Sequence, residues 1–214
     1  MGKQAEAVFI NCSYGESFRP LLRAILFCTL RLGLKPLIAN EVSDSGRVRR
    51  DRILKLIRQS QYSIHDLSTV VDTRDSSILH LNMPFELGLD LGVRFSDAKV
   101  QDRKIALVLE EKEGDVKKMM SDFGFGETKA HRNQGKRLVR AIRNHFYAAL
   151  REKNRESVTL PDATDIWYEF NTFTKDLETT PDGRLRDPDD LDEMENAEFI
   201  DEAQRWIEDK VQQG

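Results

Sequence analysis

The chain lacks the features typical of secreted, membrane-spanning and zinc-binding proteins. It has two cysteines in 214 residues, Cys12 and Cys28, and neither lies in a C-x-x-C or Cys/His cluster. We therefore expect no disulfide framework and no zinc site, and both cysteines are predicted to be small buried residues. No apolar run approaches the roughly 20 residues of a membrane span, and the N-terminus has no apolar signal core. The expected placement is the cytoplasm, without membrane association.

Three motifs that mark common enzyme chemistries are also missing. The chain contains no G-x-G-x-x-G, no Walker loop and no G-x-S-x-G. Hydride transfer from a dinucleotide, ATP hydrolysis by a P-loop and serine hydrolysis are therefore not supported. We expect no resident cofactor and no metal.

Charge is plentiful but unevenly distributed. The net charge is −4, yet residues 1–150 hold 25 Lys/Arg against 18 Asp/Glu, and residues 151–214 hold 8 against 19. This asymmetry predicts a main domain over 1–153 and an acidic helical extension over 154–214. The extension either covers a basic surface of its own chain or docks on another chain.

Hydrophobic periodicity predicts a strand–helix alternation. Apolar runs predict strands over 7–12, 36–39, 62–68 and 104–109, and a weak edge strand near 128–131. Helical spacing predicts helices over 17–32, 47–60, 115–123 and 136–153, and one after residue 82. This order favours an α/β fold with a flavodoxin-like parallel sheet of four to five strands and helices on both faces. Two more helices are expected in the extension, over 162–178 and 188–211.

Four polar segments are predicted to meet at one edge of this sheet. In an open parallel sheet, ligands bind beyond the carboxyl ends of the strands, where the strand order reverses. The candidate residues there are Asn11, Ser13 and Tyr14 after the first strand, Ser43, Gly46 and Arg47 after the second, Asp66 and Ser68 after the third, and Asn82 and Glu86 around the next helix start. The glycine and the helix start beside Arg47 also suit a phosphate group.

The segment around Glu86 is the most informative of the four. Pro84 suits the first position of a helix, and this would place Glu86 in its first turn. Gly88 and Gly92 lie four residues apart, so we expect a bare helix face that packs closely against the sheet. Glu86 is then either a catalytic carboxylate at the rim of the sheet or the third residue of a capping box, bonded to the N–H of Met83.

The other segments also have simpler structural explanations. Ser13 can cap the first helix, residues 43–46 can form an ordinary turn, and Asp66 can cap a turn. His65 is interpreted as a buried core histidine, and His131 as a loop histidine without a role. The basic helix over 136–153 either contacts nucleic-acid phosphates or is a solvated face, and we favour the solvated face.

Three segments together resemble one family. They are residues 8–13 (VFINCS), 63–68 (SIHDLS) and 82–88 (NMPFELG). In this order they resemble bacterial proteins with a TIR-like, nucleoside 2-deoxyribosyltransferase-like fold, over roughly residues 6–150. The resemblance implies that Glu86 is catalytic, that Asp66 helps to hold the base or ribose, and that residues 11–14 line a nucleotide pocket. It also implies antiphage defence by depletion of NAD or a nucleotide, dependent on oligomerisation or a sensor partner.

Three functions follow from these patterns. The first is an N-glycosidase or glycosyl transferase acting on NAD, a nucleotide or a nucleoside, because a carboxylate such as Glu86 stabilises the oxocarbenium character of the reacting sugar. The second is a non-catalytic module that senses a nucleotide. The third is an interaction subunit, a homo-oligomer or the subunit of another protein, that assembles through residues 154–214 and keeps a folded core when they are removed.

Overall fold

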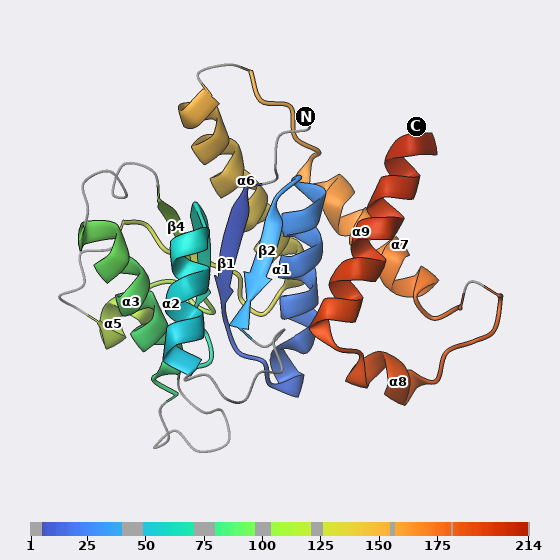
Figure 1. The fold of residues 1–214 in the computed structure, drawn as a ribbon, viewed down its shortest axis with the longest axis horizontal. Coiled ribbons are helices and arrows are strands. Elements are labelled where there is room, and N and C mark those ends of the chain that lie inside the picture. Colours follow the sequence, from blue (N-terminus) through green and yellow to red (C-terminus); the bar gives the residue numbers. More distant parts are fainter. Residues whose placement is uncertain are drawn as a thin grey trace.

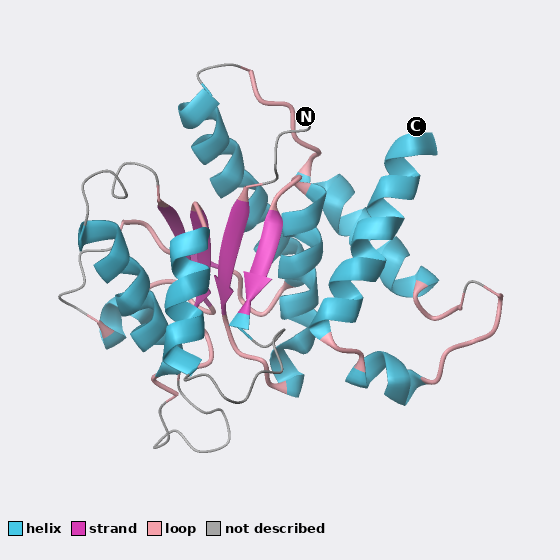
Figure 2. Cartoon of the chain, in the orientation of Figure 1, coloured by secondary structure: helices cyan, strands magenta, loops and turns pink. Residues whose placement is uncertain are grey.

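A computed structural model describes residues 6–39, 49–70, 80–96, 104–120, 126–154, 157–180 and 182–213. Its five strands are β1 (Ala7–Asn11), β2 (Lys35–Ile38), β3 (Tyr62–Asp66), β4 (Ile105–Glu110) and β5 (Lys129–Ala130). They form one parallel sheet in the order β2-β1-β3-β4-β5, which Figure 2 shows surrounded by helices. The predicted α/β, flavodoxin-like fold is confirmed.

Helices cover both faces of the sheet. They are α1 (Arg19–Arg31, preceded by the 3-10 turn Glu16–Phe18), α2 (Arg49–Gln59), α3 (Asn82–Ser96), α5 (Asp115–Met119), α6 (Gly135–Asn154), α7 (Ala163–Asp176), α8 (Pro188–Glu193) and α9 (Asn196–Gln213). Figure 1 shows α2 and α3 on one side of the strands and α1 and α6 on the other. Within the described residues, none of these helices is both long and apolar enough to cross a bilayer.

The alternation of side chains along β1 explains its continuous apolar sequence. Val8 and Ile10 lie in the main core beneath α1 and α6, whereas Phe9 packs with Ile53 and Ile57 of α2. A strand buried on both faces needs apolar residues at successive positions, because neighbouring side chains point to opposite faces.

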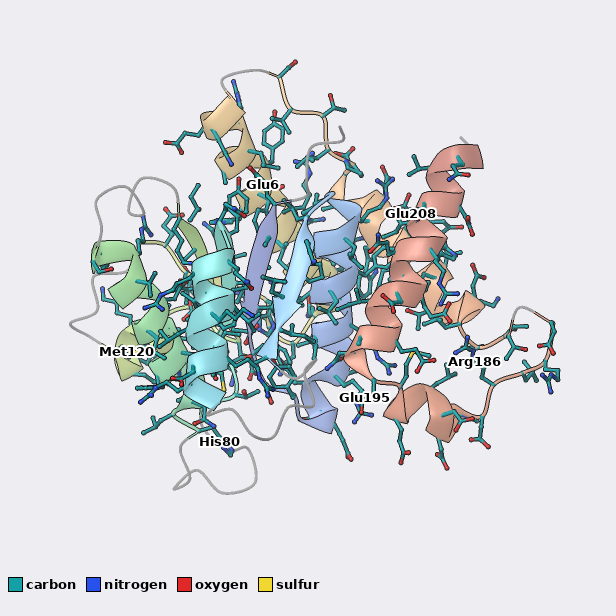
Figure 3. The ribbon with its side chains drawn as sticks, viewed as in Figure 1. Glu6, His80, Met120, Arg186, Glu195 and Glu208 are labelled. Carbon is teal, nitrogen blue, oxygen red and sulfur yellow. The ribbon has the colours of Figure 1, made fainter. Side chains whose placement is uncertain are left out.

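The strand order reverses between β1 and β3. From β1 the chain moves to β2 on one side and then returns to β3 on the other, where Asn11 and His65 are paired in register. Glu6, just before β1, and His80, just before α3, lie at opposite ends of the molecule in Figure 3. The start of α3 therefore shares an edge of the sheet with the carboxyl ends of β1 and β3.

The acidic extension packs on α1 through aromatic rings. The ring of Phe27 on α1 stacks on Phe173 of α7, with centroids 5.3 Å apart, and also contacts Phe170 and Trp206. These residues, Trp206 only partly buried, join the same hydrophobic cluster as the inner residues of β1. The extension thus completes the core on this side of the sheet.

One ion pair and one side-chain hydrogen bond accompany these aromatic contacts. Arg31 at the end of α1 lies 2.6 Å from a carboxylate oxygen of Glu169 on α7, and Arg23 donates to the carbonyl oxygen of Leu191. The extension therefore contacts cationic side chains of its own chain, as the charge asymmetry suggested.

The single helix predicted over 188–211 is wrong, because it is two helices, α8 and α9. The break falls at Met194, whose backbone is extended with ψ of 123°. This turn buries the side chain of Met194 in the main core beside Phe199. Core packing therefore prevails over the helical periodicity of the sequence.

Candidate functional site

The side-chain amide of Asn11 joins the end of β1 to the start of α3. Its Nδ2 donates to the carbonyl oxygen of Met83 at 2.9 Å and lies 2.9 Å from Nδ1 of His65. Because both contacts use the nitrogen, the amide oxygen keeps its capacity to accept from a ligand. Asn11 is 2% exposed and is thus fixed at the point where the strand order reverses.

His65 continues this contact into the core. Its Nδ1 accepts from Asn11, so the proton is on Nε2, which donates to Oδ2 of Asp90 at 2.9 Å. The hydroxyl of Ser63 donates to the same oxygen at 2.6 Å. His65 is fully buried, so its interpretation as a core histidine is confirmed.

Asp90 on α3 forms a buried ion pair with Lys104, which directly precedes β4. The Nζ atom of Lys104 lies 2.9 Å from Oδ1 of Asp90, and both side chains are nearly inaccessible. Burial acts to raise the pKa of Asp90, but the hydrogen bond from His65, the ammonium of Lys104 and the hydroxyl of Ser63 outweigh it and lower the pKa to about 2. Asp90 is therefore a carboxylate in the folded protein.

Lys104 anchors this series at the opposite edge of the sheet. Its Nζ also donates to the carbonyl oxygen of Ile57 at 2.7 Å and to the hydroxyl of Ser60 at 3.1 Å, both near the end of α2. We call the series Asn11–His65–Asp90–Lys104 the polar line. The polar line runs beneath α3, from the carboxyl end of β1 to the opposite edge of the sheet, where β4 begins.

Asp66 at the end of β3 contacts two groups of its own chain. Its Oδ1 accepts from the backbone N–H of Ser68 at 3.0 Å and also from the Ser68 hydroxyl. Its Oδ2 lies 3.1 Å from Nε2 of His131, which follows β5. Nδ1 of His131 accepts from the N–H of Asn133 at 3.0 Å, so the proton of the neutral ring is on Nε2, but neither Nε2 nor Oδ2 of Asp66 has a hydrogen-bond partner among the described residues. Asp66 thus links β3 to the segment before α6.

Glu86 lies in the second turn of α3, and the capping-box interpretation is wrong. The helix begins at Asn82, so Pro84 is its third residue and Glu86 its fifth, with no acidic residue in the first turn. A proline is tolerated at the third position because its N–H would have no partner within the helix. Glu86 is 6% exposed and faces inward, with Met83 and Leu87.

Cys12 lies near both candidate carboxylates. Burial raises the pKa of its thiol well above its usual value, and the charges of Asp66 and Glu86 raise it further. Cys12 directly follows β1, Asp66 ends β3 and Glu86 is on α3. The structure therefore brings these two predicted residues together around the end of β1.

The remaining predicted residues lie at the rim or outside the described part of the chain. Tyr14 accepts from the N–H of Ala39 at 3.4 Å and so joins the first loop to the end of β2. Ser13 accepts from the N–H of Gly15 rather than capping α1, and Asn82 is exposed. The proposed phosphate-binding residues lie outside the described residues: Ser43, Gly46 and Arg47.

The glycines of α3 do not pack against the sheet as predicted. A Cβ atom added at Gly88 or Gly92 would meet no described atom within 4 Å. Because α3 turns Glu86 and Asp90 inward, the glycine face points away from the core.

Sequence reasoning missed three residues of this region, namely Asp90, Lys104 and His131. His131 was interpreted as a loop histidine, but it is fully buried. Two signals in the sequence could have found the other two. Asp90 is four residues after Glu86 and so shares its helix face, and Lys104 directly precedes a buried strand.

The grooves described on the surface lie on the extension, away from this region. One of about 600 Å³ lies between the α1–β2 turn and α9 and includes Lys35 and Ile207. Another of about 440 Å³ lies beside α8 and includes Arg186 and Glu195. No three His, Cys, Asp or Glu side chains of the described ranges are grouped as ligands for a metal ion.

A scan against protein-family models, a search of curated proteins and a search of solved structures each find no match to the chain.

Proposed function

We propose that the chain cleaves the N-glycosidic bond of NAD, a nucleotide or a nucleoside, by hydrolysis or by transfer of the sugar. One observation carries the proposal: the buried carboxylates of Glu86 and Asp66 lie near Cys12, beyond the ends of β1 and β3. Sheets with this strand order bind their ligands at that position.

Glu86 is the proposed catalytic carboxylate. When the bond between C1′ and the base breaks, the base leaves with the electron pair and C1′ gains positive charge. Glu86 either stabilises this charge or forms an ester bond to C1′. Water or an acceptor molecule then bonds to C1′, the ester bond breaks where it has formed and returns its electron pair to Glu86, and the proton of the incoming group passes to the released nucleobase or to solvent. Apolar neighbours such as Met83 and Leu87 lower the local dielectric and strengthen the effect.

Asn11 and Asp66 have supporting roles in this proposal. The amide oxygen of Asn11 accepts from a ribose hydroxyl, because its nitrogen is already engaged with His65 and Met83. Asp66 fixes the half-buried hydroxyl of Ser68, which is then oriented toward the sugar. Ser43, Gly46 and Arg47 remain the proposed seat for a phosphate group.

The test compares product formation by two glutamate variants. The purified chain is incubated with NAD and a panel of nucleosides and nucleotides, and released base is followed by liquid chromatography. Glu86→Gln, which keeps the shape and removes the charge, is expected to lower turnover by roughly 100-fold or more. Glu152→Gln, an exposed carboxylate on α6, is the matched control and should keep full turnover. Equal turnover by both variants would overturn the proposal.

A non-catalytic nucleotide sensor is the second candidate. The observation that favours it is the polar line, which connects the candidate site to the opposite edge of the sheet through buried side chains. A ligand that competes for Asn11 would disturb contacts at both edges. This function predicts that a nucleotide raises the melting temperature while no base is released. By the resemblance, either function would serve antiphage defence together with a second copy or a sensor partner.

A further inference from the structure

The outward face of α3 is apolar, although it lies on the surface. Leu81 and Phe85 are each 59% exposed and Phe95 is 63% exposed. At 3.6 residues per turn, these side chains and Gly88 and Gly92 fall opposite the face that holds Asp90. We call these five residues the outer stripe. The opposite face of α3 is already buried, so an exposed apolar patch on the outward face is typical of a contact site for another molecule.

The outer stripe has almost no charge. The charged residues of α3 are Glu86, Asp90 and Arg94. The two carboxylates are buried, and the guanidinium of Arg94 lies 5.8 Å from the ring of Phe95 on the same helix. By contrast, α9 exposes Asp201 and Glu208. Of these two surfaces, the outer stripe is therefore the one that a second copy can approach without repulsion between like charges.

Apart from Leu81, the residues of the outer stripe are placed symmetrically about Asp90. Phe85 and Phe95 lie five residues on either side of Asp90, and Gly88 and Gly92 lie two residues on either side. In an antiparallel two-fold pair, Phe85 is level with the partner's Phe95 and Gly88 with the partner's Gly92. Such an interface uses the same patch on both subunits and must be complementary to itself.

We infer that the outer stripe of α3 is a homodimer interface, in which two α3 helices pack antiparallel around a two-fold axis near residue 90. Gly88 and Gly92 let the two backbones approach closely, because glycine has no side chain. No described atom of the same chain occupies the space beside either glycine. The phenylalanines flank this central contact. The inference does not depend on the proposed function.

The exposed apolar side chains of the stripe supply about half of a small dimer interface. An aromatic side chain covers roughly 150–250 Å², so Leu81, Phe85 and Phe95 together expose about 300 Å² per copy. Two copies then contribute about 600 Å², around half of the ~1,200 Å² buried by the smallest stable interfaces. The rest of the interface is expected from side chains beside the stripe, and Gly88 and Gly92 add backbone contact.

The first test is the mass of the full chain by light scattering over a range of concentrations. The wild type is expected to have twice the monomer mass, and Gly92→Leu and Phe85→Glu are expected to weaken the dimer at least tenfold. Gly92→Leu should fold, since a Cβ atom added there meets no described atom within 4 Å and leucine favours a helix over glycine by about 1 kcal/mol. Tyr168→Glu, at a position 69% exposed on α7, is the control.

A second test fixes the geometry by crosslinking. The double variant Gly88→Cys/Gly92→Cys should form disulfide-linked dimers under mild oxidation, because the pairing brings each cysteine beside one of the other copy. Gly126→Cys, which also has open space, should not. The natural Cys12 and Cys28 are buried and do not interfere. A monomeric wild type at about 100 µM, or a dimer that survives both substitutions without crosslinking, overturns the inference.

Discussion

Asn11 and His65 are hydrogen-bonded across neighbouring parallel strands, and His65 is in turn hydrogen-bonded to Asp90. Replacing His65 by phenylalanine keeps the volume but leaves the amide of Asn11 and one oxygen of Asp90 without this partner. We expect His65→Phe to lower the free energy of unfolding by about 2–4 kcal/mol. Urea unfolding measures the loss, and Tyr168→Phe on the surface should change stability by less than about 0.5 kcal/mol. An equal effect of both substitutions would contradict the assigned role of His65.

The ion pair between Asp90 and Lys104 should show strong coupling. Lys104→Met removes the cation and leaves a buried carboxylate, which should cost about 3–5 kcal/mol of unfolding free energy. The double variant Asp90→Asn/Lys104→Met should lose less than the sum of the two single variants, because neither charge is then left alone. Lys112→Met, at an exposed lysine, is the control. Additive losses would show that the two side chains do not interact.

Acid should destabilise the protein in two steps. The pKa of His145 is lowered from 6.5 to about 4, first by burial and then by the nearby charge of Lys129. The unfolded chain therefore takes up a proton before the folded one, and stability falls as the pH drops from about 6.5 to 4. Asp90, with its pKa lowered to about 2, adds a second loss between about pH 4 and 2.

The pH dependence is checked by urea unfolding at closely spaced pH values. His145→Gln should remove the first step and leave the second. The result to compare is how the free energy of unfolding changes with pH in each variant, rather than its value at pH 7. A first step that persists in His145→Gln would assign it to another group.

Gly135 at the start of α6 lies under the ring of Trp167. A Cβ atom at this position would be 2.5 Å from a ring carbon of Trp167, so the Trp167 ring or the backbone beside it must move to admit it. Gly135→Ala should lower the free energy of unfolding by about 1–3 kcal/mol and change the fluorescence of Trp167. Gly126→Ala, where space is open, should do neither.

The acidic extension should be required for folding. Ending the chain at residue 156 exposes Phe27 and its neighbours on α1, which now pack on Phe170, Phe173 and Trp206. We expect this truncation to abolish cooperative thermal unfolding and to increase dye binding to exposed apolar surface. A truncated chain with the native melting transition would instead support the expectation of a separable interaction module.

The sheet could be predicted from the sequence because buried parallel strands are continuously apolar. The runs around Phe9 and Leu107 have this character, and each becomes a buried strand, whereas β3 around Ile64 is buried although it contains Ser63 and His65. The convergence of Asn11, Asp66 and Glu86 then followed from topology, since the carboxyl ends of parallel strands share an edge.

The polar line could not be predicted because its contacts join distant segments. Asn11 and His65 are 54 residues apart, and Lys104 reaches Ile57 across 47. From the sequence alone, a lysine or an aspartate is expected to be exposed. Burial of such a charge is costly in free energy unless a partner from elsewhere in the chain pairs with it. The prediction that Gly88 and Gly92 pack against the sheet was wrong for a related reason. Residue spacing defines a helix face but does not show what that face contacts.

The two edge strands limit how this sheet can associate. β2 contains Pro36, which has no N–H to donate, and β5 is only two residues long. A strand of another molecule would therefore find few backbone groups to pair with at either edge, and this protects the sheet from edge-to-edge aggregation. Association through the sheet is thus disfavoured, and contacts with other molecules are left to the helices.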